Sequence, residues 1–208
     1  MLSIRDVSYR YGADMPPVLQ HVSLEIARGE RVALLGPSGY GKSTLALLLA
    51  GYLPMQSGTV TLDGKPVPTG GYCPIQLVYQ HPEKAMDPRW KLGKTLSEAW
   101  DIPAELFTAI GAEERWLSRF PHELSGGQLQ RLSILRALCP TTRVLVADEI
   151  TASLDPITQS QIWSVISREA AAHDMTLLAI THNEHLAERI CTRIVHVEEL
   201  QGSGADSA

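Results

Sequence analysis

Cysteine is scarce in this 208-residue sequence. The three that occur, Cys73, Cys139 and Cys191, are far apart, odd in number and not paired in a C-x-x-C motif. That pattern argues against a disulfide framework and against a thiolate metal motif. We therefore expect reduced, structural thiols of the kind found in cytosolic proteins.

Long hydrophobic runs are also missing. The longest, around 45–53, is too short to cross a bilayer, and the N-terminus has no apolar core of a signal peptide and carries an acid as early as Asp6. If the protein works at a membrane, we expect it to do so from the cytosolic side and through a partner.

An excess of positive charge is absent as well. Lys and Arg number 18 against 23 Asp and Glu, giving a net charge of −5, which argues against a broad nucleic-acid surface, so we expect no nucleic-acid partner. The content of hydrophobic residues, 44%, indicates a folded globular chain of one or at most two domains.

What the sequence does contain is a phosphate-binding loop. The segment 36–44 matches G-x-x-x-x-G-K-[ST], with an apolar run at 31–35 before it and helix formers at 45–50 after it. Backbone N–H groups of such a loop point at phosphate oxygens, and the start of the following helix adds a partial positive charge. We expect phosphate contacts from the whole loop, namely Gly36, Pro37, Ser38, Gly39, Tyr40, Gly41, Lys42, Ser43 and Thr44.

A pair of carboxylates follows a second buried strand. The apolar run at 144–147 leads directly into Asp148 and Glu149. Asp148 is placed to bind Mg²⁺ together with the Ser43 hydroxyl, and Glu149 to accept a proton from an attacking water. The alternative is a solvated turn that happens to carry two acids.

Three further features are weak alone. The hydroxyl and glycines at 124–128 form a second helix start suited to an anion, although they could simply cap a helix. His182 follows an apolar strand, where a contact to the γ-phosphate is possible, and Gln80 ends a strand of its own.

Hydrophobic periodicity predicts strands alternating with helices, hence an α/β fold with a parallel core. The first strands are joined by turns and predict an antiparallel β edge, and 81–123 is expected to be an inserted α-helical subdomain. We expect strands at 2–9, 18–26, 31–35, 58–64, 75–80, 143–147, 175–180 and 192–197, an exposed loop at 65–74, and helices at 45–50, 129–138, 156–172 and about 183–190.

Taken together, in this order, these motifs resemble the ATP-binding subunits of ABC transporters over about residues 2–200. The signature is Leu124-Ser125-Gly126-Gly127-Gln128. The resemblance implies a P-loop NTPase of the ABC type as a single domain over 1–208. Its RecA-like core and β edge would occupy 1–80 and 124–200, its helical subdomain 81–123, and a flexible tail 201–208.

The resemblance also implies roles. Tyr11 would stack on adenine, with Tyr9 as a competitor, and Gln80 would contact Mg²⁺ and water. Asp155 would belong to the D-loop and His182 would be the switch histidine. Ser125, Gly126, Gly127 and Gln128 would face the γ-phosphate of ATP bound to another subunit.

The segment Tyr79–Arg89 is similar to the corresponding segment of the peptide and nickel importers of this family. It implies an ATPase at the cytoplasmic face of the inner membrane, paired with a second ABC ATPase subunit, identical or different. Two transmembrane permease subunits, and indirectly an extracytoplasmic solute-binding protein, would be its partners. Two alternatives stay open: a soluble ABC-type ATPase not coupled to transport, and a regulatory ABC subunit. Ile150 and Asn183 depart from the family, which usually has proline and aspartate there.

Overall fold

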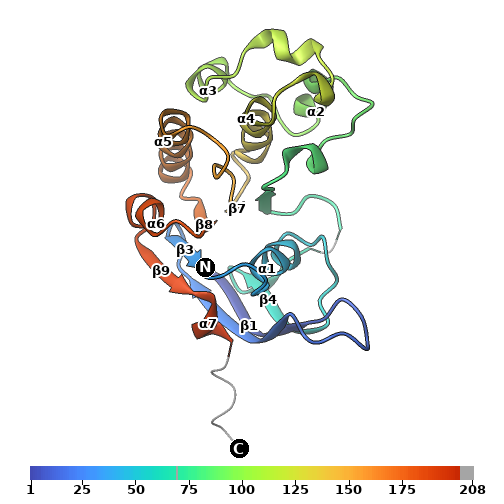
Figure 1. Cartoon of the computed structure of the whole chain (residues 1–208), viewed down its shortest axis with the longest axis vertical. Coiled ribbons are helices and arrows are strands. Elements are labelled where there is room, and N and C mark those ends of the chain that lie inside the picture. The colour runs from blue at the N-terminus through green and yellow to red at the C-terminus, as the bar shows by residue number, and fades with distance from the viewer. Residues whose placement is uncertain (69, 202–208) are drawn as a thin grey trace, which may run out of the picture.

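A parallel sheet forms the centre of the protein, as seen in a computed structural model that describes residues 1–68 and 70–201 (Figure 1). Its strand order is β6-β7-β8-β3-β9, and every neighbouring pair is parallel. The inner strands β7 and β8 each contain four consecutive apolar residues and are buried at every position, as a sheet covered on both faces requires. The bounds are β3 (Arg31–Leu35), β6 (Ile75–Val78), β7 (Val144–Asp148), β8 (Thr176–Ile180) and β9 (Arg193–His196).

The antiparallel strands form a sheet of their own, so the edge expected from the sequence is a second sheet with the order β2-β1-β4-β5. Its strands are β1 (Leu2–Tyr9), β2 (Leu19–Ile26), β4 (Ser57–Leu62) and β5 (Lys65–Pro66). Asp63 and Gly64, at φ 51° and 76°, make the tight turn between β4 and β5. The loop expected at 65–74 therefore begins with a short strand.

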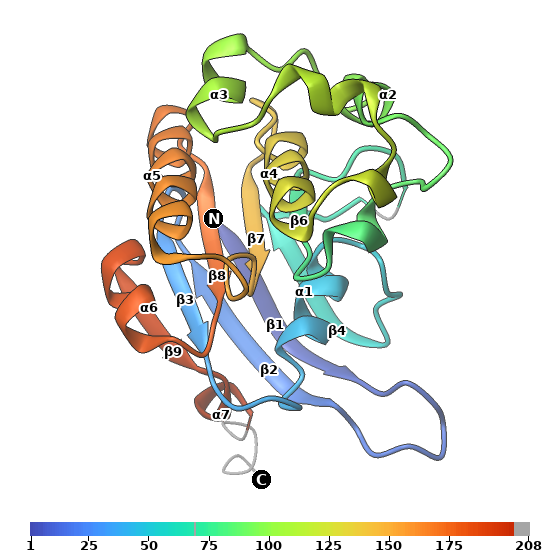
Figure 2. The same ribbon diagram turned by 45° about the horizontal axis from the view of Figure 1, so that its top comes forward.

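Two apolar cores cover the two faces of the parallel sheet. On one face lie α4 (Gly126–Ala137) and α5 (Pro156–Ala172), which pack on β7 and β8 (Figure 2). On the other face lie α1 (Lys42–Leu49) and the antiparallel sheet. The short helix α6 (Glu184–Ile190) contacts β3 at the side of this sandwich. The predicted α/β fold is confirmed.

The segment between β6 and α4 is helical throughout its regular elements and gathers at one end of the molecule (Figure 1). It contains η1 (Pro82–Ala85), α2 (Leu92–Ser97), α3 (Ala104–Ala109), η2 (Glu114–Ser118) and η3 (Pro121–Glu123). Between α3 and η2 the chain turns at Gly111, whose φ is 72°. The division of the chain into core and subdomain stays a prediction.

Three smaller expectations have different outcomes. The strand expected at 192–197 ends at His196 and is followed by a helix that the sequence did not predict, α7 (Val197–Leu200). The expected tail lies, apart from Gln201, outside the described residues. Burial raises the pKa of the Cys73 and Cys191 thiols, the latter to about 12, so these cysteines are protonated at neutral pH.

Among the helices at 1–68 and 70–201, none combines the length and the apolar character that crossing a membrane requires.

Candidate functional site

The phosphate loop connects β3 to α1 at the carboxyl end of the parallel sheet. Gly41 is the N-cap of α1 at φ 82°, and a Cβ there would stand 2.6 Å from Leu19 and 2.7 Å from the carbonyl of Val18, so glycine is required. The buried Lys42 places its Nζ 2.7 Å from the carbonyl oxygens of Gly36 and Pro37. The ammonium is therefore held over the loop itself.

Asp148 lies at the end of β7 beside the start of α1. Its side chain is buried, and this burial raises the pKa of the carboxyl above its ordinary value. A hydrogen bond with Ser43 and the charge of Lys42 act in the opposite direction, while the neighbouring Glu149 adds to the rise. The structure thus joins Asp148 to the phosphate loop, as the two predicted magnesium ligands require.

Glu149 is flanked by the two residues that were weak candidates alone. His182 Nδ1 lies 3.2 Å from Glu149 Oε1, and Gln80 Nε2 donates to Glu149 Oε2 at 3.4 Å. The three come from the ends of β8, β7 and β6, which are neighbours in the sheet. Because the carboxyl ends of parallel strands meet at one edge, this cluster shares that edge with the phosphate loop.

Tyr11 lies beside the same helix start. Its hydroxyl is 3.1 Å from Thr44 Oγ1, and its ring meets Tyr9 edge to face with the ring centroids 5.2 Å apart. Tyr9 is buried in the core, whereas Tyr11 is 54% exposed, so Tyr11 is the ring available to a ligand.

The signature residues lie apart from this cluster, at the start of α4. Ser125 is its N-cap: Ser125 Oγ accepts from the N–H of Gln128, and Gln128 Oε1 accepts from the N–H of Ser125 at 3.0 Å. Gly126 has open space around it, since no atom of the described residues lies within 4 Å of the place that a Cβ would take. These hydrogen bonds stay within the helix start, so the structure does not bring the signature to its own phosphate loop.

Two loop residues also serve as helix caps. Asp155 caps α5 by accepting from the N–H groups of Ile157 and Thr158, and these hydrogen bonds lower the pKa of its carboxyl. Asn183 caps α6 by accepting from the N–H of Leu186 at 3.0 Å, as an aspartate would. The second departure, Ile150, is buried in the core.

Sequence reasoning missed the support behind Glu149. The hydroxyl of Thr151 accepts hydrogen bonds from Trp163 and Gln159 of α5. No sequence motif contains these three residues, and a tryptophan on the apolar face of a helix is expected to be a core residue.

Within the described residues, no group of three His, Cys, Asp or Glu side chains is arranged to hold a metal ion. Mg²⁺ is commonly bound by one or two carboxylates together with phosphate oxygens of the substrate. One buried carboxylate beside a serine hydroxyl and the phosphate loop fits that donor set.

Comparisons with known proteins agree with this geometry. The sequence model of the family described as "ABC transporter" matches residues 19–152. The nickel import ATP-binding protein of Rhodospirillum rubrum is 34% identical over 95% of this chain and 78% of its own length. The thiamine import ATP-binding protein of Shigella flexneri is 34% identical over 100% of this chain and 97% of its own length.

A longer relative and a solved structure are also similar to this chain. A candidate peptide import ATP-binding protein of Brucella abortus is 35% identical over 83% of this chain, which spans only 58% of that relative's length. Among solved structures, an ATP-binding cassette in a dimeric post-hydrolysis state with ADP and Pi has a TM-score of 0.80 at 25% identity. The match covers 97% of this chain and 94% of that one.

Proposed function

The chain belongs to the ABC transporter family, as an ATPase, and on that premise we propose that it is the ATP-binding and hydrolysing subunit of an importer. It would act at the cytoplasmic face of the inner membrane and energise uptake through partner transmembrane subunits. The observation that carries this proposal is the cluster of Glu149, His182 and Gln80 on the sheet edge that also holds the phosphate loop.

ATP would bind along the start of α1. The loop N–H groups and Lys42 would hold its phosphates, and Tyr11 would face the adenine. Ser43, Asp148 and Gln80 would hold Mg²⁺, which would supply charge neutralisation at the phosphates. Ser43 and Lys42 both lower the pKa of Asp148, so this carboxyl lies beside the start of α1.

Hydrolysis would use Glu149 as the general base. A water attacks the γ-phosphorus, its proton passes to Glu149, and the bond from the γ-phosphorus to the bridging oxygen breaks to leave ADP and inorganic phosphate. His182 and Gln80, which contact the two oxygens of that carboxylate, would fix its orientation.

Replacing Glu149 with glutamine tests this role. Glu149→Gln keeps the shape but cannot take a proton, so we expect hydrolysis to fall by at least about 100-fold while ATP affinity is retained. Glu188→Gln, an exposed site on α6, is the matched control. Hydrolysis by Glu149→Gln at the wild-type rate would refute the general-base role.

The second phosphate-facing helix start indicates a partner subunit. Ser125 and Gly127 would cap the γ-phosphate bound at Lys42 of a second ABC ATPase subunit, because within this chain they lie at a separate helix start. A composite site of this kind would make ATP close the dimer and hydrolysis reopen it.

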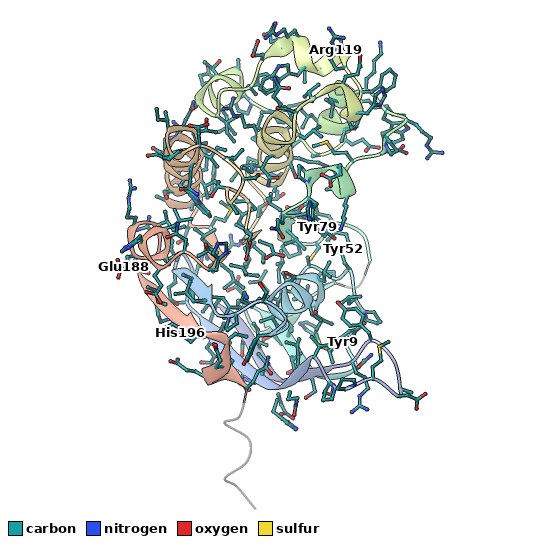
Figure 3. All side chains as sticks on the ribbon, viewed as in Figure 1. Tyr9, Tyr52, Tyr79, Arg119, Glu188 and His196 are labelled. Atoms are coloured by element: carbon teal, nitrogen blue, oxygen red, sulfur yellow. The ribbon has the colours of Figure 1, made fainter. Side chains whose placement is uncertain are left out.

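A surface hollow beside Gln80 is the place we propose for a transmembrane partner. It has a volume of about 560 Å³ and is lined by residues that include Tyr52, Tyr79, Met86 and Arg89. The rings of Tyr52 and Tyr79 meet with centroids 5.6 Å apart (Figure 3). Movement of a segment seated here would reach Gln80, the next residue after Tyr79.

For the solute, we propose a peptide, nickel or a metal chelate. The support is the segment after Gln80 and the names of the nickel and candidate peptide relatives, while the thiamine relative shows that the family's solutes vary. Uptake of labelled nickel and of a labelled dipeptide, in cells with and without the chain, separates these solutes. Failure to co-purify any transmembrane subunit would favour an ABC ATPase that is not coupled to transport.

A further inference from the structure

Glu149 has an unfavourable backbone conformation. Its φ is 49°, in the left-handed region, although it is not glycine. A residue keeps such a conformation only where its surroundings fix it. One constraint lies on the strand side, where the N–H of Glu149 donates to the carbonyl of Ile180 at 3.0 Å. The other constraint must come from the segment that follows.

Thr151 supplies that second constraint. Its side chain is 2% exposed, and Oγ1 accepts from Trp163 Nε1 at 3.0 Å and from Gln159 Nε2 at 2.9 Å. Gln159 Nε2 also lies 3.3 Å from the Thr151 carbonyl oxygen. Both donors belong to the long helix α5, so they tie the turn after Glu149 to a rigid element.

Trp163 and Gln159 also line a cavity together with Glu149. This cavity of about 80 Å³ is lined by Glu149, Thr151, Gln159 and Trp163, together with His182. Because buried hydrogen bonds leave few alternative partners, loss of either donor would let the turn shift into this space.

We propose that Trp163 and Gln159 are positioning residues for ATP hydrolysis, which act by holding Thr151 and so aim the carboxylate of Glu149. Neither residue is among those proposed to contact the nucleotide. The inference rests on the proposed role of Glu149 as general base, and it predicts an effect on kcat that ATP affinity does not share.

The test measures kcat and KM for ATP hydrolysis, ATP affinity, and Tm on the full chain at saturating Mg²⁺. Trp163→Phe removes the N–H donor and keeps an aromatic ring, and we expect kcat to fall roughly tenfold with KM unchanged. Trp100→Phe is the matched control, since Trp100 Nε1 donates to the carbonyl of Leu135 in another part of the chain. Gln159→Leu is a second variant at a less buried position.

Variants of Thr151 separate positioning from packing. Thr151→Ser keeps the hydroxyl that accepts the two hydrogen bonds and should retain wild-type kcat. Thr151→Val keeps the shape of the side chain without that hydroxyl, and its kcat should fall to the same extent as that of Trp163→Phe. The inference is overturned if Trp163→Phe and Thr151→Val both keep wild-type kcat while Glu149→Gln does not. It is also overturned if kcat falls only together with Tm and to the same extent in Trp100→Phe. Wild-type hydrolysis by Glu149→Gln would instead refute the proposed function.

Discussion

Burial disfavours the charged form of the Asp148 carboxyl. In the folded chain its pKa is raised, chiefly by burial, so just above the ordinary value of 3.8 the folded form still binds a proton that the unfolded form has lost. The free energy of unfolding therefore falls as pH rises from 3.8 to the folded-state pKa, and it stays lower at neutral pH. This is a loss of stability at a side chain that the proposed function needs.

Asp148→Asn should therefore stabilise the fold and abolish hydrolysis. We expect the free energy of unfolding at neutral pH to rise by about 1 kcal/mol, measured by urea unfolding, because the amide carries no charge to bury. Asp155→Asn is the control, since hydrogen bonds lower the pKa of that carboxyl and its removal should bring no gain. Equal responses of the two variants would contradict this account.

At the level of single residues, the sequence singled out the candidate site residues but not the side chains that contact the segment after Glu149. Lys42, Asp148 and Glu149 follow apolar strands in recognisable patterns, and the structure places them on one sheet edge. The pairing of Thr151 with Trp163 could not be predicted, because it depends on how α5 packs against a loop twelve residues earlier.

At the scale of elements, β4 shows what a glycine does inside a sheet. Gly58 lies at φ 78° opposite an irregular stretch of β1, and a Cβ there would stand 2.5 Å from the carbonyl oxygens of Arg5 and Asp6. Gly64 has nearly the same φ, 76°, but none of the described residues comes within 4 Å of a Cβ there. The two positions share a left-handed backbone conformation, which would strain any residue with a side chain, and they differ in steric contact.

Alanine at these two positions should have different effects on stability. Gly64→Ala should lower the free energy of unfolding by about 1 kcal/mol from strain alone, and Gly58→Ala by roughly 2 kcal/mol more because backbone must move. Urea unfolding of the two variants measures the difference. Equal decreases in the free energy of unfolding would show that the backbone of β1 moves away from the new Cβ at no energetic cost.

The boundaries of elements follow the strength of their local signals. The sequence predicts the helix at 156–172 to the residue, because a proline follows its N-cap and a strong apolar face continues to its end. The helix α7 is only four residues long, so hydrophobic periodicity cannot reveal it, although Glu198 and Glu199 lie in its first turn. That the antiparallel strands make a separate sheet is a tertiary fact that turn signals cannot specify.

At the scale of the whole molecule, the separation of the signature from the phosphate loop predicts complementation. Ser125→Arg should leave ATP binding by one subunit intact and lower hydrolysis at least about 100-fold, since the bulky side chain would fill the place of the γ-phosphate. Lys42→Ala should also be inactive, because it loses the lysine that holds the phosphates of ATP in its own subunit. Mixed, the two chains form one intact site, with Lys42 from one and Ser125 from the other.

The measurement is ATPase activity of each variant alone and of the mixture. Recovery of activity on mixing supports a site shared between two copies. A mixture as inactive as its components would contradict a homodimeric shared site, and loss of ATP binding by Ser125→Arg alone would contradict sharing altogether.

The short helix α7 and the residue after it contact the nucleotide loop. Val197 lies against Gly36, and Gln201 Nε2 donates to the carbonyl of Tyr40 at 2.8 Å, so the end of the described chain is attached to the nucleotide loop. Met1, by contrast, pairs through its ammonium group with Asp63 on the antiparallel sheet. A fluorescent label at position 201 should therefore change its emission when a nucleotide occupies the loop, which a titration with ATP would measure.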